Sequence, residues 1–240
     1  MSKRVGFDRI IKIEWLDAVA GRMQYEKDGK KLRRYLHDLL KNDHPNFEAR
    51  RKTITVLMRI WFQVPQEYAE MRERASHLIN DSNANDRIWI HWGMILLAYP
   101  FFRDVVSIIN RLFALQGEFS VSQVIRKMEE SWGQRTTVIR ATQRVIRSLS
   151  EWGVIDETER RGVYTPAPKL KTSNLDIEIW FTEAVLRAER SDFIPLEEVY
   201  RMPSAFPFSL SLSTSDLIDS RRFELTQQGL NRGTIVARGR

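Results

Sequence analysis

One short stretch of the sequence concentrates side chains that recognise phosphates and base edges. Between Ser131 and Ser150 there are four arginines and no acidic residue. At helical spacing, residues 136–151 separate into an apolar face and a polar, cationic face. The polar face carries Thr137, Arg140, Gln143, Arg144 and Arg147. Arginine binds phosphates and guanine edges, and Gln and Thr reach other base edges in the major groove. A solvated surface helix usually mixes charge signs, and no acid is expected to pair with these arginines within the helix, so the pattern favours nucleic-acid contact.

The residues before this helix predict a helix-turn-helix. Ser120 with Gln123 has the spacing of a capping box, which marks the start of a helix that runs to Trp132. A short turn that contains a glycine and Arg135 then leads into the arginine-rich helix, which we expect Thr136 to cap. Two helices joined by a short, glycine-containing turn are typical of this motif.

A β-hairpin is predicted after the arginine-rich helix. Short β-prone runs lie on either side of Asp156–Gly162, and Arg160 and Arg161 lie near the predicted tip. The order helix, helix, turn, helix, hairpin over about residues 101–168 resembles the winged helix-turn-helix family. The resemblance implies that residues 136–151 are a recognition helix, that the hairpin is the wing, and that the partner is double-stranded DNA.

A second resemblance concerns the whole chain. A helical N-terminal domain followed by this central unit is similar to the BrxA family of BREX phage-defence islands. The segment from Trp132-Gly-Gln-Arg-Thr-Thr to Trp152-Gly-Val-Ile carries the likeness, and this chain has further residues after it. The resemblance implies a DNA-binding accessory protein in bacterial antiviral defence, with no catalytic residues inherited.

The rest of the chain predicts a mainly α protein. Apolar residues recur at i, i+3 and i+4 through the first hundred residues, which predicts a helical bundle. Near the C-terminus, the alternation over residues 206–212 predicts a strand, and residues 223–225 and 234–237 predict a paired hairpin. The predicted domains are a helical domain (1–100), a winged helix-turn-helix (101–168) and a C-terminal α+β module (169–240). The last is interpreted either as a second, degenerate winged helix or as an interaction module.

A secondary basic patch lies on a predicted N-terminal helix. It comprises Arg50, Arg51 and Lys52, opposite an apolar stripe. Alone, such a group is interpreted as a solvated face. If the fold places it beside Arg140 and Arg144, the basic surface becomes continuous and extends the nucleic-acid footprint.

Composition argues against an enzyme. The 240 residues include no cysteine and four histidines, and the formal net charge is +7. Thiolate metal sites and disulfide frameworks are thereby excluded, and no phosphate-loop or hydrolase motif is present, so we predict no catalytic residue, metal or cofactor.

No signal peptide is recognisable, which favours a cytoplasmic protein. The apolar run over residues 88–102 is shorter than the roughly 18 residues of a membrane span and contains His91, so we expect a buried helix with a core histidine and no membrane contact.

The sequence therefore predicts a non-enzymatic, DNA-binding accessory or regulatory protein. Two alternatives stay open. Winged helices also dock proteins, so the chain is alternatively an adaptor subunit of a defence or regulatory complex. Its arginine-rich helices also suit an RNA-binding protein, although no RNA-recognition motif accompanies them.

Overall fold

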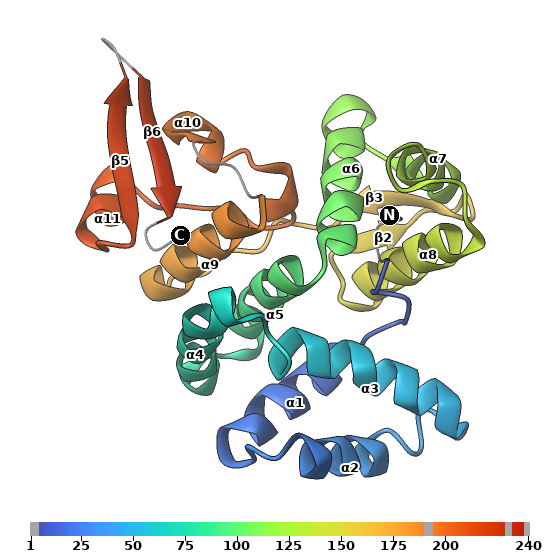
Figure 1. Cartoon of the computed structure of the whole chain (residues 1–240). Coiled ribbons are helices and arrows are strands. Elements are labelled where there is room, and N and C mark those ends of the chain that lie inside the picture. The colour runs from blue at the N-terminus through green and yellow to red at the C-terminus, as the bar shows by residue number, and fades with distance from the viewer. Residues whose placement is uncertain (1–4, 190–193, 229–231, 238–240) are drawn as a thin grey trace.

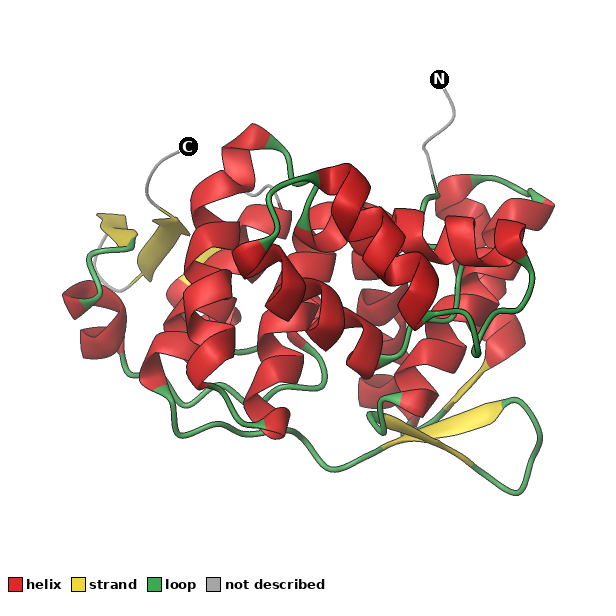
Figure 2. Ribbon diagram, turned by 90° about the horizontal axis from the view of Figure 1, so that it is seen from below, coloured by secondary structure: helices red, strands yellow, loops and turns green. Residues whose placement is uncertain are grey.

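The chain is mainly helical, as predicted. The computed structural model describes residues 5–189, 194–228 and 232–237, and these ranges contain two small antiparallel sheets among the helices (Figures 1 and 2). The first hundred residues form α1 (Ile13–Tyr25), α2 (Gly29–Leu39), α3 (Phe47–Trp61), α4 (Ala69–Leu78) and α5 (Ala84–Ala98), with short 3-10 turns at Gln66–Tyr68 and Ile79–Asp81.

Helix α5 is the buried centre of the N-terminal helices. Every residue from Ile88 to Ala98 is buried, which confirms the predicted core helix. The core histidine is also confirmed: Trp61 Nε1 donates to His91 Nδ1 (3.2 Å), and His91 Nε2 donates to Asp17 Oδ1 (3.0 Å). No single helix in the described ranges is long and apolar enough to cross a membrane. Helix α5 and the helix that follows it reach that length and apolar character only when they are taken together, and the two are bent by 117° relative to each other.

The central unit spans residues 100–166. Its elements are α6 (Pro100–Gln116), β1 (Phe119–Ser120), α7 (Val121–Trp132), α8 (Thr136–Glu151), β2 (Ile155–Glu157) and β3 (Val163–Pro166). The strands form an antiparallel sheet in the order β1-β3-β2, with Tyr164 opposite both Phe119 and Glu157. The predicted hairpin is thus confirmed, and the short β1 extends it to three strands.

Local signals decide where α7 and α8 begin. The capping box of Ser120 and Gln123 forms as predicted at the start of α7. The prediction that Thr136 caps α8 is wrong, because Thr136 is already the first helical residue and Arg135 is the N-cap. The Arg135 backbone is extended, and its guanidinium donates to the Trp132 carbonyl (3.0 Å) instead of capping the helix. Gly133, at φ +87°, allows the sharp turn between the helices.

The C-terminal unit repeats the topology of the central unit. Its elements are α9 (Leu175–Glu189), β4 (Ile194–Pro195), α10 (Leu196–Val199), a 3-10 turn (Pro203–Ala205), α11 (Thr214–Asp219), β5 (Phe223–Gln228) and β6 (Arg232–Ala237). The sheet order is β4-β6-β5, with Phe223 opposite Ala237, so the predicted C-terminal hairpin is confirmed. Both units therefore order their elements as helix, strand, helix, helix, strand, strand, and both place the last strand in the middle of the sheet.

The strand predicted over residues 206–212 is wrong. This segment forms no ladder and makes one isolated bridge, between Phe208 and Leu170. Its aromatic side chains are buried against helix α5, where the Phe208 ring lies 4.4 Å from Trp89 and 5.3 Å from Trp92 between centroids. The alternation of apolar residues in this segment therefore reflects burial of its side chains against α5, not pairing of its backbone in a sheet.

Candidate nucleic-acid interface

Helix α8 has the amphipathic character that the sequence predicts. Val138, Ala141, Val145 and Leu149 are fully buried against the rest of the central unit. The predicted contact residues on its other side are exposed, namely Thr137, Arg140, Gln143, Arg144 and Arg147. The apolar stripe fixes the rotation of α8, so its polar side faces solvent.

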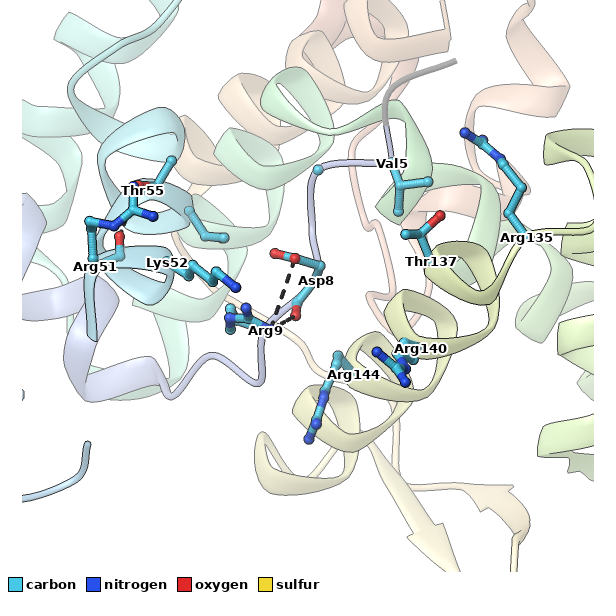
Figure 3. A pocket seen from close by; sticks show the side chains of 12 residues that line it. Val5, Asp8, Arg9, Arg51, Lys52, Thr55, Arg135, Thr137, Arg140 and Arg144 are labelled. Atoms are coloured by element: carbon cyan, nitrogen blue, oxygen red, sulfur yellow. Dashed lines mark hydrogen bonds and ion pairs between the residues drawn. The ribbon is translucent and has the colours of Figure 1, made fainter. Parts of the chain in front are cut away.

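A groove of about 800 Å³ lies between α8 and α3, two helices from separate parts of the chain. Figure 3 shows the N-terminal segment, with Asp8 and Arg9, running between the two helices. The lining residues are Val5, Gly6, Asp8, Arg9, Arg51, Lys52, Thr55, Val56, Arg135, Thr137, Arg140 and Arg144. We call this the basic groove, because these residues carry six cationic side chains and a single carboxylate.

Buried contacts hold the N-terminal segment in the basic groove. The Ile11 amide donates to the Ser148 hydroxyl of α8 (2.9 Å), and Trp152 Nε1 donates to the Ile11 carbonyl (2.7 Å). Gly6 has φ +80°, and a β-carbon there would lie 2.8 Å from the Tyr99 ring, so only glycine fits this close approach. Residues 5–12 are therefore held in place, and those of them that line the groove form a fixed floor between its two walls.

The cations of the basic groove differ in their partners. Arg51 pairs with Glu48 (2.8 Å), and Arg9 lies 3.9 Å from Asp8. The hydrogen bond from Arg51 lowers the pKa of Glu48, so that carboxylate stays charged at neutral pH. In contrast, Lys52, Arg140 and Arg144 make no ion pair with any residue that the structure describes. Unopposed cations on both walls make the electrostatic potential of the groove favourable for an anion.

The predicted site residues in α8 and at its N-cap divide into two sets. Arg135, Thr137, Arg140 and Arg144 line the basic groove, whereas Gln143 and Arg147 do not. The expectation that no acid of the helix pairs with its arginines is wrong for Arg147, whose Nε lies 3.6 Å from Glu151 at the end of α8.

In comparisons with known proteins, no family model, curated protein or solved structure matches this chain. No cluster of three or more histidines and acidic side chains in the described ranges is arranged to hold a metal ion.

The hairpin arginines also differ from each other. Arg160 forms an ion pair with Glu118, which precedes β1. Arg161 is exposed and makes no ion pair within the part of the chain that the structure describes. At this end of the central unit, Arg161 is thus the more available cation.

The secondary patch reaches the basic groove only in part. Arg50 is half-buried, and its Nη1 donates to the carbonyls of His44 (2.7 Å) and Pro45 (3.1 Å), so it supports the turn before α3. Arg51 and Lys52 do lie opposite Arg140 and Arg144 across the groove (Figure 3). Two of the three residues of the secondary patch, Arg51 and Lys52, therefore extend the basic surface of α8, whereas Arg50 does not.

Sequence reasoning missed the N-terminal segment. Arg9 lines the basic groove and also a second hollow of about 500 Å³, which shares Lys52 and Arg144 with it. The second hollow is less cationic, since its lining includes Asp43, Glu48 and Glu151. A hydrogen bond from Lys12 (2.5 Å) lowers the pKa of Asp43. No local pattern identifies Arg9, because its place depends on packing between residues more than a hundred positions apart.

Proposed function

We propose that this chain is a non-enzymatic DNA-binding accessory or regulatory protein. Its central unit would act as a winged helix-turn-helix, with α8 as the recognition helix and β2–β3 as the wing. The observation that carries the proposal is the exposed, cationic side of α8 beside a three-stranded sheet in the order β1-β3-β2. Arg140 and Arg144 make no ion pair with the described residues, so binding a phosphate would not require breaking one.

Each element has a role in the proposed complex. Helix α8 enters the major groove, where Gln143, Thr137 and the arginines reach base edges or phosphates. The wing reaches the neighbouring backbone through Arg161. Arg160 must first exchange Glu118 for a phosphate, so it contributes less.

The proposed setting is bacterial antiviral defence. It rests on the resemblance of the chain's organisation to the BrxA family. The C-terminal unit favours a protein-docking role beside DNA binding, because it repeats the topology of the central unit with a different charge. At the place of α8 it has the short α11, which carries Asp216 and Asp219 and no arginine. An adaptor role is therefore the second candidate, and it is compatible with the first.

The test is binding of the full chain to a labelled DNA duplex of about two helical turns, ~20 base pairs, followed by fluorescence anisotropy. We expect binding that weakens steeply with salt, and weaker binding after Arg144→Ala. RNA of equal length serves as competitor. Absence of duplex binding at low salt, or displacement by RNA in preference to DNA, would overturn the proposal.

A further inference from the structure

The basic groove runs along one side of the proposed recognition helix, from its N-terminal end at Arg135 and Thr137 to Arg144. A helix in the major groove, which is about 12 Å wide, has a sugar-phosphate backbone on each side of it. On one side of α8 the chain supplies a facing wall, made of Arg51 and Lys52 of α3, with Asp8 and Arg9 between the walls (Figure 3). Whatever backbone passes on that side meets cations from two separate parts of the fold.

We propose that the basic groove clamps the sugar-phosphate backbone of one DNA strand between α8 and α3. This inference rests on the proposed function and extends it. The N-terminal helices then belong to the DNA interface itself, in addition to any role as a partner-binding domain. The site is composite, because neither wall contains all of the cations.

The size and lining of the basic groove favour a backbone over other parts of a nucleic acid. Its volume of about 800 Å³ is within the ~300–1,000 Å³ of sites that enclose small ligands, far below what a duplex needs. The described residues that line it include no aromatic side chain. Sites that hold single strands by their bases use aromatic stacking platforms, which this groove does not offer. Phosphates and sugars fit both its size and its charge.

The charge distribution gives each wall a phosphate-binding role. On α8, Arg140 and Arg144 are one helical turn apart and face the groove (Figure 3). On α3, Lys52 is exposed and makes no ion pair with the described residues, and Arg51 holds only an exposed pair with Glu48. Exposed pairs of this kind are weak, so a phosphate can replace the carboxylate.

Asp8 gives the clamp a distinguishing property. It is the carboxylate among the described lining residues, it is exposed, and it lies between the two walls (Figure 3). A bound phosphate would be repelled by it, so Asp8 limits affinity. Removing its charge with Asp8→Asn should tighten DNA binding by about three- to fivefold at low salt, the upper part of the range for interactions between solvent-exposed charges.

The experiment compares Lys52→Gln with Lys31→Gln in the full chain, using a labelled duplex of ~20 base pairs. Both lysines are exposed and both variants lose one positive charge, but Lys31 lies on α2, outside the groove. Lys52→Gln should reduce the salt slope of log K by about 0.9, the value for one phosphate contact, whereas Lys31→Gln should leave it unchanged. Thermal melting of both variants checks that the fold is retained.

A second arm tests whether both walls hold the same strand. Single neutral methylphosphonates are placed along one DNA strand and then along the other. When the phosphate at one or two adjacent positions of one strand is made neutral, neither Lys52→Gln nor Arg144→Ala should lower the affinity for the duplex any further. If the two variants respond to phosphates of different strands, the clamp is wrong.

The outcomes separate this inference from the proposed function. If Arg147→Ala weakens duplex binding while Lys52→Gln behaves like Lys31→Gln, the clamp is overturned and the recognition helix stands. Weaker binding by Asp8→Asn would also contradict the clamp. If the wild-type chain binds no duplex at low salt, the proposed function fails, and the clamp fails with it.

Discussion

Replacing Ser148 by alanine should loosen the N-terminal segment that lies between the walls of the basic groove, without changing any charge. The Ser148 hydroxyl is fully buried and accepts the Ile11 amide at 2.9 Å, and Ile11 is fully buried as well. Alanine would leave that amide without its partner, at a cost of about 1–3 kcal/mol. For a chain of this size each kcal/mol lowers Tm by about 2–4 °C. We therefore expect Ser148→Ala to melt several degrees below the wild-type protein.

The same variant should also weaken DNA binding, because Arg9 lies two residues from the lost hydrogen bond and lines the basic groove. Differential scanning fluorimetry measures the first effect and duplex anisotropy the second. Ser150→Ala is the matched control, since Ser150 is on the same helix and its hydroxyl makes no hydrogen bond with the described residues. If the Tm of Ser148→Ala equals the Tm of the wild-type protein and of Ser150→Ala, the Ser148 hydrogen bond does not hold residues 5–12 in place.

Further predictions concern acid stability, core packing and the wing. Burial lowers the pKa of His91. Burial acts to raise the pKa of Asp17, but the hydrogen bond and charge of His91 together with Arg87 outweigh it, so the pKa of Asp17 is lowered. Both groups bind protons more weakly in the folded chain, so stability should fall as the pH drops below about 6.5; urea unfolding with unchanged stability at about pH 5 would contradict this. Gly93→Ala should cost about 1–3 kcal/mol in urea unfolding, because a β-carbon would lie 2.5 Å from the Trp180 ring, and an unchanged urea midpoint would contradict this. Arg161→Ala should weaken duplex binding in anisotropy titrations, and equal affinity would exclude the wing from the interface.

Local features of the central unit could be predicted from the sequence because neighbouring residues determine them. The capping box of Ser120 and Gln123 and the amphipathic split of α8 depend on spacings of a few residues. The hairpin after α8 follows from β-prone runs around a polar turn. These signals also place Arg140 and Arg144 on the exposed side of the helix.

The basic groove could not be predicted because its walls meet only through distant packing. Arg9 reaches it through the bonds of Ile11 to Ser148 and Trp152, more than 130 positions away. The spacing within residues 50–52 also does not distinguish the roles of these side chains. Arg50 donates to the carbonyls of His44 and Pro45, whereas Lys52 lines the basic groove. The strand prediction over 206–212 failed for a related reason, since aromatic contacts with α5 bury that segment.

In the proposed complex, the unpaired arginines of α8 bind DNA phosphates. The most direct test is the salt dependence of duplex affinity, between about 50 and 200 mM salt, for the wild-type chain and for the double variant Arg140→Ala/Arg144→Ala. We predict that the double variant binds more weakly and that its slope is shallower by about 1.8, or about 0.9 for each lost phosphate contact. An unchanged slope, or a wild-type chain that does not bind duplex DNA, would contradict the claim.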